Sequence, residues 1–121
     1  MDVQNRLKEA FAASPGGTPQ ERNPMNPILL LVTYHAHPGK GAAFLRAVND
    51  MGILQKIRSE EGLIAYDYFY SANDPDTVLL VEEWASDAHQ ARHLATPHMA
   101  ELARIKAEYI SDTTVRKIPL A

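Results

Sequence analysis

The sequence predicts an α+β domain in which two helices cover one face of a four-stranded antiparallel sheet. Its 121 residues are the size of one compact domain, and 45% of them are apolar, which is enough for a single core. Apolar runs typical of strands alternate with segments whose apolar residues have helical spacing. The order strand–helix–strand–strand–helix–strand is that of the ferredoxin-like βαββαβ arrangement.

The composition excludes several classes of function. The chain has a formal net charge of −3, so it has no electrostatic reason to bind nucleic acid or an anionic membrane surface. It has no cysteine, which excludes disulfides, thiolate catalysis, iron–sulfur clusters and cysteine-ligated zinc. No apolar run approaches the ~20 residues of a membrane span, and the N-terminus lacks the apolar core of a signal peptide. We therefore expect a cytoplasmic protein.

Residues 1–27 differ from the rest of the chain. A short segment with helical spacing is followed by two stretches rich in proline, glycine and asparagine, at 14–19 and 23–27, which interrupt regular structure. We expect residues 1–27 to form a partly irregular extension and residues 28–121 to form the domain.

The first strand and the first helix follow the extension. Residues 28–34 are a β-rich apolar run that ends at His37-Pro38-Gly39, as a strand buried on both faces would. Beyond it, apolar residues recur at i, i+3, i+4, i+7 and i+10, which predicts one amphipathic helix over residues 40–59. These positions are Phe44, Ala47, Val48, Met51 and Leu54. Gly62 provides a stop signal for the helix.

Two strands and a turn come next. Residues 63–71 alternate, so that Ile64, Tyr66, Tyr68 and Tyr70 share one face. Residues 73–76 have turn chemistry, and residues 77–85 form an apolar third strand. The two strands are expected to pair as an antiparallel hairpin.

The second helical region is expected to begin at the N-cap Ser86 and to break and restart at Thr96-Pro97. Residues 111–118 are predicted to be the last strand, which Pro119 either ends or marks as an edge. Two helices cover only one face of the sheet, yet the first and third strands are apolar on both faces. We therefore expect a homodimer whose two sheets pack face to face.

Residues 82–98 hold the densest group of chemically active side chains. His93 lies about six residues into its helix, or about 9 Å along the axis. That is roughly the length of three strand residues, so His93 is expected to lie near Val81 and Glu82 if its side chain faces the sheet. A cavity there would be lined by His93, by Trp84 or Glu82, and by tyrosines of the second strand. Whether Glu82 or Glu83 faces the cavity is left open.

The chain resembles the antibiotic biosynthesis monooxygenase (ABM) family, including its quinol monooxygenase-like members. The resemblance covers about residues 28–118 and is carried by Pro38-Gly39 with the helix of Phe44, Glu60-Glu61-Gly62 with the second strand, Glu82-Glu83-Trp84, Ser86-Asp87-Ala88, and His93 with Thr96-Pro97-His98. It implies a dimeric α+β barrel that oxygenates a small electron-rich aromatic with dioxygen and without metal or flavin.

In such chemistry a general base deprotonates the substrate, and the anion passes an electron to dioxygen. Histidine titrates near neutrality, so His93 is the expected base. Tyr66 and Glu82 are the other expected catalytic residues. The residues expected to bind the substrate are Trp84, Tyr68, His98 and Phe44.

Other interpretations stay open. In the alternative interpretation, His93 is a polar residue of the helix surface and Trp84 is a core residue. The tyrosines would then pack at a dimer interface. His35 with His37, and His89 with His93, have spacings that could meet at a metal. Relatives that degrade haem carry a histidine where this chain has Ala103 and an asparagine on the first strand, which has none here. A dimer that binds a small ligand without catalysis is the non-enzymatic alternative.

Overall fold

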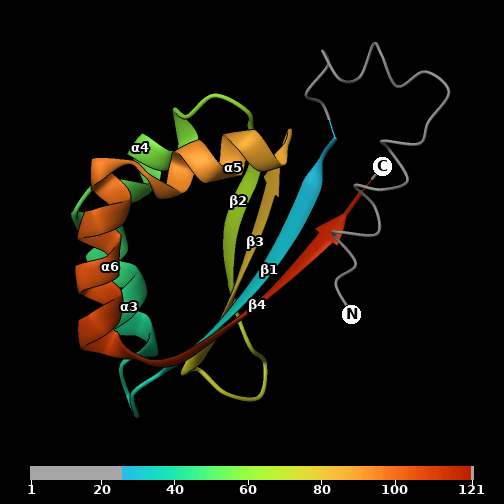
Figure 1. The fold of residues 1–121 in the computed structure, drawn as a ribbon. Coiled ribbons are helices and arrows are strands. Elements are labelled where there is room, and N and C mark those ends of the chain that lie inside the picture. Colours follow the sequence, from blue (N-terminus) through green and yellow to red (C-terminus); the bar gives the residue numbers. More distant parts are fainter. Residues whose placement is uncertain (1–25, 121) are drawn as a thin grey trace, which may run out of the picture.

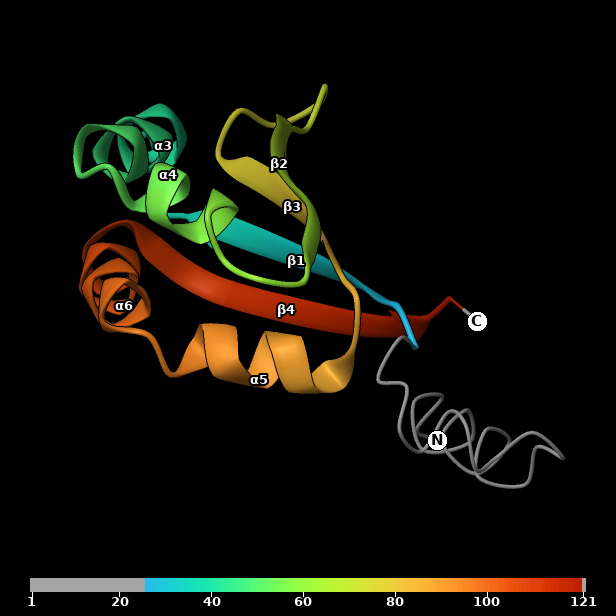
Figure 2. The same ribbon diagram turned by 90° about the horizontal axis from the view of Figure 1, so that it is seen from above.

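The computed structural model describes residues 26–120, so nearly all of the predicted extension lies outside the described residues. The elements, in chain order, are β1 (Ile28–Ala36), α3 (Gly41–Asp50), α4 (Ile53–Arg58), β2 (Leu63–Tyr70), β3 (Thr77–Trp84), α5 (Asp87–Leu94), α6 (Pro97–Tyr109) and β4 (Ile110–Pro119). The strands form one antiparallel sheet in the order β2-β3-β1-β4. All helices lie on one side of this sheet (Figures 1 and 2). The ferredoxin-like fold and its hairpin are confirmed.

The core lies between the helices and one face of the sheet, here called the inner face. Alternate side chains of β1 and β3 point to this face and are buried, while their neighbours are partly exposed. Each apolar side chain that is buried in this way contributes about 1.5–3 kcal/mol to the stability of the fold. The helices supply Phe44, Val48, Ile53, Ile57 and Leu102, each at most 1% exposed.

The predicted helix over residues 40–59 is wrong in one respect, because it is two helices. The chain breaks at Met51-Gly52, where Gly52 has φ 69°. Glycine adopts this left-handed conformation without the steric cost that other residues incur. The turn rotates Met51 to the surface, where it is 51% exposed, and brings Ile53 and Ile57 into the core instead.

The predicted alternation along β2 is also wrong at its start. Leu63 pairs with Trp84 and Ala65 pairs with Glu83, so Ile64 is an extra residue that forms a bulge. Ile64 is 53% exposed, whereas Leu63 packs against the core. Beyond the bulge, Tyr66 and Tyr68 point to the inner face as expected. At the end of the strand Tyr70 is 50% exposed.

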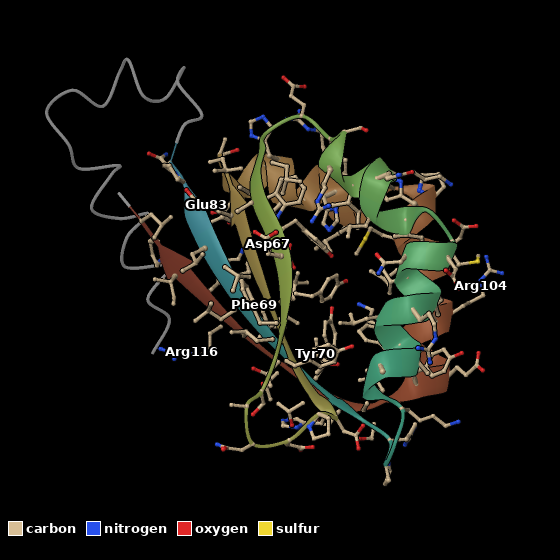
Figure 3. The ribbon with its side chains drawn as sticks, turned by 180° about the vertical axis from the view of Figure 1, so that it is seen from behind. Asp67, Phe69, Tyr70, Glu83, Arg104 and Arg116 are labelled. Carbon is tan, nitrogen blue, oxygen red and sulfur yellow. The ribbon has the colours of Figure 1, made fainter. Side chains whose placement is uncertain are left out.

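The opposite, outer face of the sheet has no helix over it. Leu29, Leu31, Leu79 and Val81 are only partly buried there, and Phe69 is 52% exposed. Figure 3 shows Phe69, with Asp67, Glu83 and Arg116, on the side of the sheet away from the helices. Within residues 26–120, none of the helices is long and apolar enough to cross a membrane.

Candidate active site

A cavity of about 370 Å³ lies between the inner face of the sheet and helices α5 and α6. Small-molecule sites have this size and this mixture of apolar walls with a few polar groups. The apolar lining is Leu30, Val32, Leu94, Met99 and Val115, and the polar lining is Tyr34, Tyr66, Glu82, Gln90, His93, Lys106, Thr113 and Lys117.

Helix α5 places His93 in the wall of this cavity. The helix begins at Ser86, whose Oγ accepts a hydrogen bond from the backbone N–H of His89, so the predicted N-cap is confirmed. His93 faces the sheet and is 1% exposed. Its ring centroid lies 4.6 Å from that of Trp84 and 5.9 Å from that of Tyr66. The imidazole therefore packs against two aromatic side chains of the sheet.

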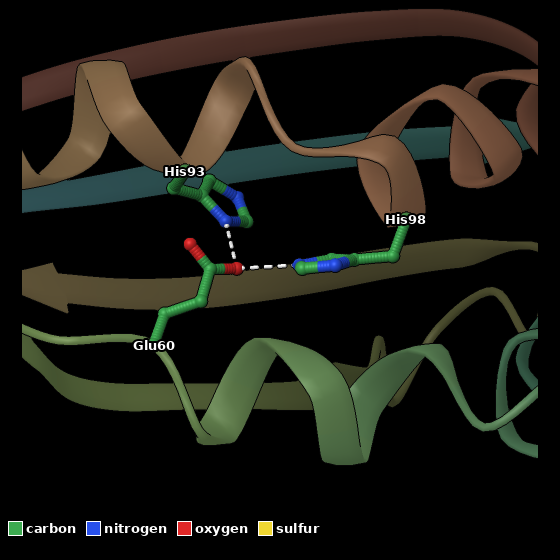
Figure 4. A group of neighbouring side chains, drawn as sticks. All are labelled: Glu60, His93 and His98. Atoms are coloured by element: carbon green, nitrogen blue, oxygen red, sulfur yellow. Dashed lines mark hydrogen bonds and ion pairs between the residues drawn. The ribbon is translucent and has the colours of Figure 1, made fainter.

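Glu60 joins His93 to a second histidine. The Oε2 atom of Glu60 lies 2.8 Å from Nδ1 of His93 and 2.7 Å from Nε2 of His98 (Figure 4). Three separate segments meet here: the loop before β2, helix α5 and the first turn of α6. The hydroxyl of Thr96 donates to the carbonyl of His93 at 2.8 Å, which fixes the turn between the two histidines.

This arrangement sets the tautomer of His93. An ionised carboxylate only accepts hydrogen bonds, so Nδ1 of His93 is the donor to Glu60. In a neutral imidazole the proton is then absent from Nε2, which keeps its lone pair. Nε2 is buried and has no hydrogen-bond partner within residues 26–120. A buried polar atom without a partner is what a ligand-binding site leaves ready for a ligand.

Glu82 and Trp84 form a second buried pair, on β3. Glu82 points to the inner face and lines the cavity, whereas Glu83 lies on the outer face, which answers the question that the sequence left open (Figure 3). Trp84 donates from Nε1 to Oε1 of Glu82 at 2.9 Å. Burial raises the pKa of Glu82, and the bond from Trp84 and the charges of His93 and Lys106 oppose this rise.

This raised pKa predicts how stability depends on pH. The pKa of Glu82 is higher in the folded protein than in the unfolded chain. Its contribution to the free energy of unfolding is therefore fully present below the unfolded pKa and is lost as the pH rises through the folded pKa. Glu82→Gln keeps the acceptor for Trp84 and cannot ionise. The variant should therefore gain stability relative to the native protein between pH 4 and pH 7, measured by urea unfolding. An unchanged difference at the two pH values would contradict the assignment.

The tyrosines of the cavity remain neutral hydrogen-bond donors. Burial is the main cause that raises the pKa of Tyr34 and of Tyr66, and neighbouring Tyr68 and Glu82 raise both further. Their hydroxyls can therefore donate to a negative charge that develops on a bound molecule. Tyr66 was expected at this position. Tyr34 was not, because its strand reads as a uniformly apolar run.

Four predicted substrate-binding residues lie outside the cavity lining. Phe44 is fully buried between Tyr34 and Tyr68, with ring centroids 5.2 and 6.2 Å away. The ring of Tyr68 packs edge-on against that of Tyr66, with 5.9 Å between the ring centroids. Trp84 donates a hydrogen bond to the lining residue Glu82, and His98 bonds to Glu60, which also bonds to the lining residue His93. Phe44 is thus part of the core and Tyr68 packs against it, and a role for either in substrate binding stays a prediction.

The predicted pairs of metal-ligating histidines do not meet. His35 pairs with Thr77 at one end of β3, whereas Trp84, which packs against His93, is at the other end. His89 is bonded to Ser86 at 2.7 Å and His37 is exposed. The described part of the chain has one group of possible metal ligands whose ligand atoms lie within 4.8 Å of one another, namely Glu60, His93 and His98. Glu60 is already hydrogen-bonded to both histidines.

Comparisons with known proteins agree with this fold. Residues 27–104 match the family model described as antibiotic biosynthesis monooxygenase. The chain is similar to protein SO0527 from Shewanella oneidensis, with 21% identity, a TM-score of 0.72, and coverage of 79% of this chain and 92% of that one. No curated protein sequence matches the chain.

Two further crystal structures have names that mention an activity. One, from Bacteroides thetaiotaomicron, is called a possible oxidoreductase; it is 25% identical, with a TM-score of 0.70, over 79% of this chain and 99% of that one. Another is called an antibiotic biosynthesis monooxygenase; it is 26% identical, with a TM-score of 0.67, over 78% of this chain and 98% of that one.

Proposed function

The chain belongs to the antibiotic biosynthesis monooxygenase family, and from this we propose that it is a cofactor-independent monooxygenase of a small electron-rich aromatic, such as a quinol or polyphenol. One observation carries the proposal. His93 lines a cavity of suitable size and is hydrogen-bonded to Glu60 through Nδ1, while its Nε2 has no partner among the described residues. A histidine held in one tautomer by a carboxylate is a competent general base.

The proposed reaction converts a quinol and one dioxygen molecule into a hydroxyquinone and one water. Nε2 of His93 accepts a proton from a ring hydroxyl, and the resulting anion gives one electron to dioxygen. The substrate radical and superoxide combine in a carbon–oxygen bond. The O–O bond of this peroxide then breaks, so that one oxygen atom stays on the ring and the other leaves as water.

The rest of the cavity supports these steps. Tyr34 and Tyr66 donate hydrogen bonds to the substrate anion, and the apolar side chains of the lining pack against its ring. Glu82, whose pKa is raised by burial, is near enough to interact with the charge of His93. Glu60 acts through His93 and is a positioning residue.

Oxygen uptake by chelator-treated protein tests this function. With a panel of quinols and polyphenols, we expect uptake well above autoxidation and one dioxygen consumed per substrate. Catalase added afterwards should return no oxygen, because no hydrogen peroxide has accumulated. Peroxide in equal amount would identify an oxidase instead. Saturable ligand binding without uptake by any compound would favour the non-catalytic binding protein.

A second copy of the chain is proposed to cover the outer face of the sheet. The apolar side chains there are too numerous to be left to solvent in a stable small domain, and a symmetric dimer buries the same face twice. The face also carries both signs of charge, with Asp67 on the β2 edge and Arg116 on the β4 edge (Figure 3). A two-fold axis along the strands would set these two edges against each other.

The dimer is tested by light scattering after size exclusion. The native protein should have twice the 13.4 kDa mass of one chain. Leu31→Glu places a charge in the middle of the outer face, and this variant should be monomeric. Ala107→Glu adds the same charge to the exposed side of α6 and should remain dimeric. A native protein of single-chain mass would overturn the proposal.

A further inference from the structure

We propose that the ligand of this cavity is an aromatic molecule with an anionic group, and that Lys106 binds this group. The inference rests on the proposed function only in assigning the substrate to this cavity. It adds a binding residue and a chemical class of ligand.

Lys106 reaches from helix α6 over the inner face of the sheet. Its Nζ atom lies 5.6 Å from the centroid of the Tyr34 ring, and its side chain lines the cavity together with His93. A cation at this distance from an aromatic face is attracted by the ring, which holds the ammonium in place. The lysine is thus directed toward the space where a ligand binds.

The ammonium of Lys106 has no ion pair among residues 26–120. The second lysine of the cavity differs, because Lys117 donates to Asp87 at 2.9 Å. Burial lowers the pKa of Lys106, while the charge of Glu82 opposes this effect. A partly buried cation without a contact partner pays a desolvation cost that an anionic ligand would offset.

Glu82 is not the anionic partner of Lys106. No contact within ion-pair distance joins it to Lys106, and its Oε1 already accepts the hydrogen bond from Trp84. Burial raises its pKa, so its charged form is disfavoured in this position. A ligand carboxylate can therefore meet Lys106, while a ring hydroxyl of the same ligand meets His93.

Calorimetric titration with two matched ligands tests the inference. The neutral ligand is 2-naphthol and the anionic one is 6-hydroxy-2-naphthoate, which differs by one carboxylate. The native protein should bind the anionic ligand at least about tenfold more tightly, which corresponds to about 1.4 kcal/mol. Lys106→Met keeps most of the aliphatic stem and should lose this preference without weaker binding of 2-naphthol. Lys106→Arg should keep the preference.

Arg104→Met is the matched control, since it removes one positive charge from the same helix at a side chain that points away from the sheet (Figure 3). It should retain the preference. Equal affinity for both ligands, a preference that survives in Lys106→Met, or no binding up to about 1 mM would each overturn the inference. The measurement needs no turnover. Oxygen uptake without the preference would therefore refute only the anion site, and the preference without uptake only the monooxygenase.

Discussion

His93→Ala should lower oxygen uptake by about 10²–10⁴-fold, the usual contribution of a positioned general base. The substitution removes the proposed base, whose Nε2 is buried in a cavity-lining residue and has no hydrogen-bond partner within residues 26–120. Uptake would be measured with an oxygen electrode under saturating quinol, after subtraction of autoxidation.

His89→Ala is the control for this prediction. His89 is also a buried histidine on α5, but it is bonded to Ser86 and does not line the cavity. Its loss should cost stability and leave turnover nearly unchanged. If both variants lose activity equally, or if His93→Ala stays active, another group is the base.

Glu60→Gln separates positioning from packing. The amide has nearly the shape of the carboxylate, but its NH₂ group can donate to Nδ1 and so favour the tautomer with the proton on Nε2. We expect kcat to fall by about tenfold or more with KM unchanged, since tautomer control alone can be worth several orders of magnitude. A rise in KM at constant kcat would assign Glu60 to substrate binding.

Phe44→Ala should destabilise the domain by about 3–5 kcal/mol, the cost of deleting a fully buried aromatic ring. Phe44 extends from α3, is completely buried, and packs against the rings of Tyr34 and Tyr68. Urea unfolding followed by circular dichroism measures the loss. Because Phe44 does not line the cavity, a variant that still folds should bind 2-naphthol as the native protein does.

Met51→Ala provides the comparison, because Met51 lies at the end of the same helix but is 51% exposed. Its effect should stay within about 0.5 kcal/mol. A Phe44→Ala variant of native stability with lost ligand binding would return Phe44 to the substrate site.

Much of the fold is visible in local sequence patterns. The turn at 73–76, the cap at Ser86 and the restart at Thr96-Pro97 each depend on residues close together in the chain, and each is confirmed. The distance of His93 along α5 follows from helix geometry and the length of the preceding strand. These features need no knowledge of distant contacts.

The rest depends on contacts between distant segments. Glu60 is 33 residues from His93, and only the folded loop before β2 brings them together. In the sequence, Lys106 cannot be distinguished from a lysine on an exposed helix face. Only the folded structure places it over the ring of Tyr34. The break at Gly52 and the bulge at Ile64 both keep the apolar spacing that an unbroken helix or strand would show, so the pattern alone does not reveal them.

The pairing of β1 with β4 has a consequence for how the chain folds during synthesis. β1 lies between β3 and β4, and its partner residues on β4 extend to Pro119. The cavity wall contributed by Thr113, Val115 and Lys117 therefore forms only after these late residues leave the ribosome. Until then one edge of an apolar strand stays unpaired, and such edges promote aggregation. Slowing translation before residue 110 should therefore increase the dependence of the nascent chain on chaperones.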